Sequence, residues 1–271
     1  MASKQGSSGR NRYQALIEKI FFDRYEKGMK NVPFTREDLQ HAAKALGIDL
    51  PKNLGDVVYA LRYRIPMPES VLETQSRGLE WIIEGTGRAN YVFKLVRANR
   101  IAPRQDLITI KIPDSTPEIV AAYALSDEQA LLAKVRYNRL IDIFLGIAAY
   151  SLQNHLRTSV GGIGQIEIDE IYVGIDRHGC QYVMPVQAKG GSDQLSVVQA
   201  KQDIVCCSQK FPTLTCRSIS AQFIDSDLIA MFELTVEKDE VKVVEEKHYR
   251  LVPADQIGTD DLKTYNIRNR Q

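Results

Sequence analysis

Three acidic residues open a strand-like segment near the middle of the chain. Residues 165–176 read QIEIDEIYVGID, with Glu167, Asp169 and Glu170 in the first half. Successive side chains of a strand face opposite sides, so we expect Glu167 and Asp169 on one face and Glu170 on the other. The turn-forming residues 176–179, Asp-Arg-His-Gly, come next. The segment therefore predicts the first arm of a β-hairpin.

The second arm carries an amide and an amine on one face. Residues 181–189 read QYVMPVQAK, in which Gln187 and Lys189 are two positions apart. Antiparallel pairing would bring Asp169 near both. Mg²⁺ prefers oxygen ligands, and it activates water and stabilises the charge that builds on phosphorus. Lys189 would orient or help deprotonate that water, because lysine shifts its pKa readily when desolvated. These residues indicate metal-dependent cleavage of a phosphodiester.

The hairpin with Asp169, followed by Gln187-Ala188-Lys189, resembles the motif of the PD-(D/E)xK nuclease superfamily, which includes type II restriction endonucleases and several repair nucleases. The resemblance covers roughly residues 126–235. It implies that Asp169 binds the metal, that Gln187 holds the (D/E) position and that Lys189 is the catalytic lysine. It also implies an additional acid, Glu128, in the helix before the hairpin. The implied fold is an α/β/α core with a central mixed sheet, and the implied cofactor is Mg²⁺, with Mn²⁺ able to substitute.

Gln187 departs from this pattern, because the usual residue at its position is Asp or Glu. The amide oxygen can still bind Mg²⁺, but it brings no negative charge. A neighbouring acid, Glu167 or Glu170, is then a candidate additional metal ligand. A degenerate core that binds DNA without cutting it remains an alternative.

The surrounding segments are expected to build the rest of this core. Ser126 with Gln129 forms a capping box, and the apolar spacing after it predicts one long helix reaching Leu152. A second helix, residues 195–207, follows the loop after Lys189, and its Gln199 and Gln202 are auxiliary candidates. The expected strands are residues 107–112, 218–223 and 228–235, with a hairpin made of 240–244 and 248–252.

The N-terminal third predicts three helices and a hairpin. Apolar residues spaced as on one helical face run through 12–27, and Thr35 with Asp38 caps a second helix that ends at Gly47. A third helix begins at Asn53. Strand-like residues 79–84 and 91–96 flank the turn 85–88. Helix-turn-helix followed by a hairpin is typical of a winged helix, which places its third helix in the major groove. The alternative is a helical domain that only packs on the rest of the chain.

Charge supports a polyanionic partner for this third. Residues 1–104 hold 18 Lys and Arg against 11 Asp and Glu, whereas the whole chain has a net charge of +1. A basic front and an acidic remainder indicate different partners, a polyanion and a cation. The candidate DNA contacts are Lys52, Arg62, Arg64, Arg77, Arg88 and Lys94.

The sequence lacks the patterns that are typical of membrane spans, zinc sites and nucleotide-binding loops. The chain of 271 residues has no apolar run long enough for a membrane span, and residues 1–10 are polar, as in a disordered leader. Four cysteines without a CxxC pair and four scattered histidines favour reduced thiols over a zinc site. No Gly-rich nucleotide motif is present. We expect a cytoplasmic protein without a nucleotide cofactor.

The expected fold class is α/β, with a restriction-endonuclease-like domain over residues 105–271 and a winged-helix domain over residues 11–104. The leading hypothesis is a sequence-specific, Mg²⁺-dependent endonuclease of double-stranded DNA, acting as a homodimer because two-fold sites suit symmetric dimers. Two alternatives stay open: a structure-specific DNA repair nuclease, and a non-catalytic DNA-binding regulator with a degenerate core.

Overall fold

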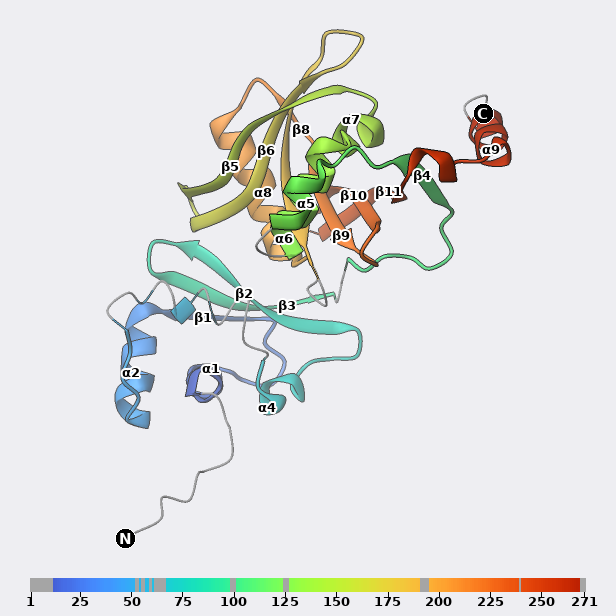
Figure 1. Ribbon diagram of the computed structural model, residues 1–271. Helices are drawn as coiled ribbons and strands as arrows, with labels where there is room; N and C mark the ends of the chain where they lie inside the picture. Colours follow the sequence, from blue (N-terminus) through green and yellow to red (C-terminus); the bar gives the residue numbers. More distant parts are fainter. Residues whose placement is uncertain are drawn as a thin grey trace. The chain divides into compact units, whose positions relative to one another are not determined.

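The computed structural model describes residues 12–51, 54, 57–58, 60, 67–97, 101–123, 127–190, 195–238 and 240–268. The chain divides into two compact units (Figure 1). The first comprises residues 1–98 with 161–164, and the second comprises residues 99–160 with 165–271. The division falls a few residues before the boundary expected at residue 104. Ile101 explains the difference, because it is 3% exposed and belongs to a hydrophobic cluster of the second unit.

The first unit combines short helices with a small antiparallel sheet. Residues 54, 57, 58 and 60 are also helical, within the region where the third helix was expected. The sheet order is β1-β3-β2. The named elements are α1 (Arg12–Phe22), β1 (Asn31–Thr35), α2 (Arg36–Leu46), α4 (Glu69–Leu72), β2 (Leu79–Gly87) and β3 (Asn90–Arg97).

The core of this unit follows the apolar spacing of its sequence. Helix α1 buries Leu16, Ile17, Ile20 and Phe21, as expected, but it ends at Phe22 rather than near residue 27. Strand β2 buries Trp81 and Ile83, which lie on the same face of the strand. The alternation of side chains expected for this strand is therefore confirmed. Strand β1 and helix α4 were not anticipated from the sequence.

The capping box of α2 is formed as predicted. The Asp38 backbone N–H donates to Thr35 Oγ1 at 3.3 Å, and the Thr35 N–H donates to Asp38 Oδ2 at 2.7 Å. Gly47 ends the helix in the left-handed region, with φ of 64°. Burial opposes ionisation of Asp38, yet hydrogen bonds from Arg24 and Thr35 hold the pKa of its carboxyl below the usual value. Ionised Asp38 therefore stabilises the folded unit.

Thr35→Ala is expected to destabilise the first unit by about 1 kcal/mol, because it leaves an N-terminal amide of α2 without its acceptor. Urea unfolding of the full chain, followed by the fluorescence of Trp81, measures the change. The Asp38 contribution is full above the usual pKa of 3.8 and is lost as pH falls through the lowered folded value. The exposed Thr86→Ala serves as control, and equal stability of both variants would contradict the prediction.

The second unit is a mixed α/β structure around one large sheet (Figure 1). Its strands run in the order β4-β11-β10-β9-β7-β6-β5, with β8 paired to β7. Strands β7 and β9 are parallel, as are β11 and β4. The named elements are β4 (Thr109–Pro113), α5 (Glu118–Tyr123), α6 (Asp127–Tyr137), α7 (Leu140–Leu145), β5 (Ala148–Val160), β6 (Gly164–Ile175), β7 (Gln181–Lys189), α8 (Val197–Lys210), β8 (Thr215–Cys216), β9 (Ser218–Phe223), β10 (Leu228–Glu237), β11 (Glu240–Val252), the 3-10 helix η1 (Ala254–Gln256) and α9 (Thr259–Arg268).

Helices cover both faces of this sheet. Helices α6 and α7 share a hydrophobic cluster with Met184, Val186 and Met231. Helix α8 contributes Ala200 to a second cluster with Phe232. Met231 and Phe232 are adjacent on β10, so the two clusters lie on opposite faces. The large mixed sheet flanked by helices agrees with the α/β class expected from the sequence.

Two expected elements were wrong. The helix predicted to continue to Leu152 ends at Gly146, which has φ of 68°, and residues 148–160 form strand β5 instead. Arg139, with φ of 51°, separates α6 from α7. The hairpin predicted between residues 240 and 252 is the single strand β11. Its register on β10 shifts between Glu233 and Leu234, and this irregularity replaces the expected turn.

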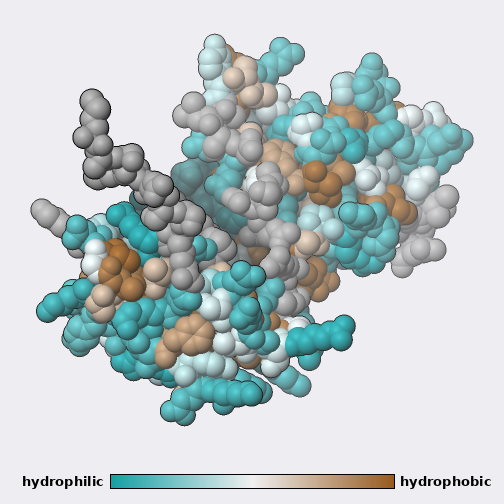
Figure 2. All heavy atoms as spheres, turned by 90° about the horizontal axis from the view of Figure 1, so that it is seen from below, coloured by the Kyte–Doolittle hydropathy of each residue, from teal (hydrophilic) through white to brown (hydrophobic). Residues whose placement is uncertain are grey.

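The surface carries scattered apolar side chains. On the face seen in Figure 2, hydrophilic residues predominate and hydrophobic ones occur in small groups. Among the described residues, no helix is long and apolar enough to cross a membrane.

All four cysteines are free thiols; Cys206 and Cys207 are buried, whereas Cys180 is exposed.

Candidate active site

Strands β6 and β7 form the expected antiparallel pair, with Glu170 opposite Val186. At the end of this register, the backbone N–H of Ala188 donates to Asp169 Oδ2 at 2.9 Å. The Asp169 carboxylate therefore lies against the backbone between Gln187 and Lys189. The hairpin brings the three residues together, as their spacing predicted.

Lys189 is largely enclosed and faces an acid from another element. Its Nζ atom lies 3.6 Å from Glu128 Oε1, and its side chain is 12% exposed. Glu128 stands in the first turn of α6. Burial raises the pKa of the Asp169 carboxyl; Lys189 and the Ala188 amide oppose this rise, and Glu128 adds to it. Asp169, Lys189 and Glu128 therefore share one electrostatic neighbourhood.

The Gln187 side chain has one defined orientation. Its Nε2 atom donates to Asp203 Oδ2 at 2.9 Å and to the backbone oxygen of Glu167 at 3.2 Å. Both amide hydrogens are used, because a glutamine amide has two donors. Oε1 is buried and has no hydrogen-bond partner among the described residues. The described residues therefore leave the acceptor capacity of Gln187 Oε1 unused.

Asp203 is the site residue that the sequence analysis missed. It lies on α8, is 1% exposed and contacts Gln187 directly. Burial raises the pKa of its carboxyl well above the usual value, and the hydrogen bond from Gln187 works against this rise. The sequence held a signal, because Asp203 falls three positions before buried Cys206, on the helical face that packs inward.

The glutamines proposed on the same helix occupy different environments. Gln202 is buried, and Gln199 is partly buried. Neither glutamine is the residue that contacts Gln187; the next residue along the helix, Asp203, makes that contact. His155 on β5 was also overlooked. Its backbone is left-handed, with φ of 47°, and it is the smallest of the influences that oppose the rise in the pKa of the Asp169 carboxyl.

The two remaining candidate acids differ in position. The Glu167 carboxylate lies 3.2 Å from Arg157 Nε, on the face that also carries Asp169. Glu170 is on the opposite face, 0% exposed, with Oε1 2.8 Å from Arg136 Nη2. Strand alternation separates Glu170 from the cluster, so the structure does not support Glu170 as a metal ligand beside Asp169.

The proposed DNA contacts are placed in part. Lys52, Arg62 and Arg64 lie outside the described residues. Arg77, in the turn before β2, and Arg88, in the turn between β2 and β3, are exposed. Lys94 is 3.4 Å from Glu84 and is 25% exposed, so its charge is partly neutralised within the sheet.

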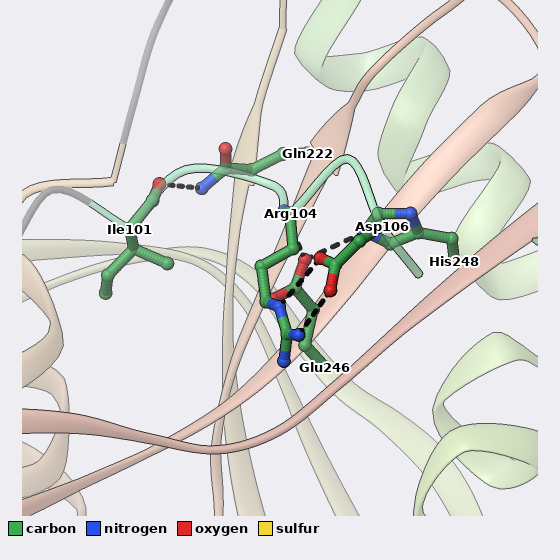
Figure 3. Close-up of polar contacts among 6 residues, drawn as sticks. All are labelled: Ile101, Arg104, Asp106, Gln222, Glu246 and His248. Atoms are coloured by element: carbon green, nitrogen blue, oxygen red, sulfur yellow. Dashed lines mark hydrogen bonds and ion pairs between the residues drawn. The ribbon is translucent and has the colours of Figure 1, made fainter. Parts of the chain in front are cut away.

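A second polar cluster adjoins the Lys189 strand. Gln222 is the parallel partner of Lys189 on β9, and its Nε2 donates to the backbone oxygen of Ile101 at 3.0 Å. Figure 3 shows Arg104 and Asp106 facing Glu246 and His248 on β11. The Arg104 backbone N–H donates to Glu246 Oε1 at 2.8 Å, and His248 Nε2 lies 2.8 Å from the same oxygen. These contacts fasten residues 101–106 to the sheet.

A cavity of about 330 Å³ lies beside this second cluster, between Ile101, Phe232 and Val243 among others. Its lining includes none of Asp169, Gln187, Lys189 or Glu128. The cavity is therefore not lined by the candidate active-site residues.

The donor set around Asp169 suits a hard cation. In the part of the chain that the structure describes, no three His, Cys, Asp or Glu side chains gather as a metal site. Mg²⁺, however, is usually held by one or two carboxylates and keeps several waters. The Asp169 carboxylate and the unpartnered Gln187 oxygen match that requirement. Comparisons with protein-family models, curated proteins and solved structures gave no match.

Proposed function

We propose that the protein is a Mg²⁺-dependent endonuclease that hydrolyses duplex DNA in the manner of type II restriction enzymes. The observation that carries the proposal is the hydrogen bond from Ala188 to Asp169, which joins the carboxylate to the strand of Gln187 and Lys189. The order of elements also fits the PD-(D/E)xK resemblance. Helix α6 supplies Glu128, the β6–β7 hairpin supplies the motif, and a loop leads into α8.

Each residue has a defined task in this proposal. Asp169 and Gln187 would hold the metal through oxygen atoms. A metal bound there would supply positive charge to activate water and to stabilise the transition state. The Lys189 ammonium orients the attacking water and offsets the phosphate charge. Glu128 holds Lys189 towards the cluster, at 3.6 Å in the structure.

The first unit is proposed as a winged-helix DNA-binding domain. Its element order is α1-β1-α2, then helical residues, the short helix α4 and the β2–β3 hairpin, and this order supports the assignment. The excess of basic residues before residue 104 supports a nucleic-acid partner. A homodimer would let two such modules read a two-fold DNA site.

Arg77→Ala and Arg88→Ala are each expected to weaken duplex binding with little regard to sequence. Each arginine is exposed in a turn next to β2, where it would contact phosphate. Losing one phosphate contact reduces the slope of log affinity against log salt by about 1. Fluorescence anisotropy over a salt series measures that slope. The exposed Glu73→Ala is the control. An unchanged slope in both arginine variants would show that these two turns do not contact DNA.

Digestion of a large unmethylated DNA tests the proposed activity. The purified protein with Mg²⁺ should yield discrete fragments with mapped ends, and a chelator should stop cleavage. Structure-dependent nicking of branched DNA would instead favour a repair nuclease.

The neutral Gln187 favours one second candidate, a non-catalytic DNA-binding regulator. Under that reading the protein binds DNA but cuts no sequence with either Mg²⁺ or Mn²⁺. The digestion experiment separates the two functions directly.

A further inference from the structure

We infer that Asp203 is a positioning residue of the proposed site, because it accepts a hydrogen bond from the Gln187 amide and so helps to fix which atom of that amide a ligand can meet. The inference rests on the proposed function, because it assigns Gln187 to the metal. The related pattern has Asp or Glu at the Gln187 position, and either oxygen of a carboxylate can accept. An amide offers its oxygen on one side only, so the orientation of Gln187 matters.

The hydrogen bonds permit one orientation of the amide. Nε2 faces two acceptors, Asp203 Oδ2 at 2.9 Å and the Glu167 backbone oxygen at 3.2 Å. A flipped amide would place Oε1 against the Glu167 backbone oxygen, which has no hydrogen to donate. Oε1 therefore points away from Asp203 and remains without a partner among the described residues. Asp203 and the Glu167 backbone oxygen together fix which atom of Gln187 is offered to a ligand.

Burial makes this orientation rigid. Gln187 is 2% exposed and Asp203 is 1% exposed, so neither side chain can turn towards solvent. Helix α8 begins at Ser196, whose side chain accepts a hydrogen bond from the Val198 backbone N–H. This cap sets the start of the helix and therefore the position at which Asp203 meets β7. The contact joins two elements that are fixed independently.

A neighbouring serine marks the same place. Ser220 on β9 is the parallel partner of Gln187 and is 0% exposed. Its Oγ atom is also buried without a hydrogen-bond partner in the described parts of the chain. Two buried oxygen atoms without partners among the described residues therefore belong to paired residues of adjacent strands.

Exchanging the amide of Gln187 and the carboxyl group of Asp203 between the two positions tests the inference. Gln187→Glu alone places two carboxyl groups against each other, and Asp203→Asn alone replaces the carboxyl acceptor of the Gln187 hydrogen bond by an amide. Each is expected to lower Mn²⁺ affinity and cleavage by about 10- to 100-fold, as for other groups that orient ligands. The double variant again pairs one carboxylate with one amide, in reversed positions. It should recover most of the lost affinity and cleavage.

Control variants separate positioning from general effects of charge. Gln165→Glu, exposed on β6, and Asp225→Asn, exposed after β9, make the same chemical changes away from the cluster. Both should keep the Mn²⁺ affinity of the original protein. A double variant no better than the single ones, or Asp203→Asn with full Mn²⁺ affinity, would overturn the inference.

A measurement without metal or DNA tests the geometry itself. In ¹⁵N-labelled protein, the Gln187 side-chain NH₂ should give two resonances with slow hydrogen exchange, identified by their loss in Gln187→Glu. Asp203→Ala should shift them and speed their exchange. Rapid exchange in the original protein would refute the Asp203 contact, whereas a protected amide in a protein that never cuts DNA would refute only the nuclease function.

Discussion

Lys189→Ala is expected to lower DNA cleavage by about 10²- to 10⁴-fold, the range for loss of a positioned acid–base group. The Lys189 side chain is 12% exposed and its ammonium lies 3.6 Å from Glu128. The backbone N–H of its neighbour Ala188 donates to Asp169, so Lys189 lies next to the oxygens proposed to bind the metal. Single-turnover cleavage with saturating protein measures the effect on the chemical step.

Duplex binding separates catalysis from recognition in this variant. The proposed DNA contacts lie in the first unit, so Lys189→Ala should bind the same DNA within a few-fold of the original protein. Lys189→Arg should not restore cleavage, because a guanidinium remains protonated and has a different shape. Lys263→Ala, exposed on α9, is the matched control. Lys189→Ala that cuts as fast as the control would remove Lys189 from the mechanism.

The paired strands of the site were predictable from residue alternation. In β6, side chains alternate between the two faces, so Asp169 and Glu170 face opposite sides. In the structure, Asp169 accepts a hydrogen bond from the β7 backbone, and Glu170 forms an ion pair with Arg136. Gln187 and Lys189 share a face for the same reason. This pattern is local, because it depends only on neighbours within one hairpin.

Asp203 could not be assigned in the same way, because its contact depends on how α8 crosses the sheet. Residues 187 and 203 are joined through tertiary packing rather than through a local period. An acid on the buried side of an amphipathic helix signals a polar partner. The sequence alone does not name that partner.

Strand β5 was missed for a different physical reason. Residues 140–152 contain apolar positions that match helical spacing, and helix α7 does use the first of them. Gly146 then adopts the left-handed conformation and the following residues pair with β6 at the edge of the sheet. Short apolar segments allow either structure, and the sheet decides between them.

Arg136→Met is expected to lower the free energy of unfolding of the second unit by about 3 kcal/mol, because it leaves a buried charge without its partner. Glu170 is 0% exposed. Its Oε1 accepts from Arg136 Nε at 3.0 Å and Nη2 at 2.8 Å. We expect the lower end of the range for broken buried pairs because the Arg136 side chain is 37% exposed. Urea unfolding measures the loss.

The double variant Arg136→Met with Glu170→Gln identifies the cause. Removing the charge from Glu170 should restore much of the stability, since Ser151 can still hydrogen-bond to the neutral amide. Without such recovery, lost packing of Arg136 would be the cause rather than the unpaired carboxylate. Because Glu170 faces away from Asp169, cleavage per folded molecule should remain close to that of the original protein in both variants. A loss of cleavage in the folded double variant would instead connect the Arg136–Glu170 pair to the chemistry at Asp169.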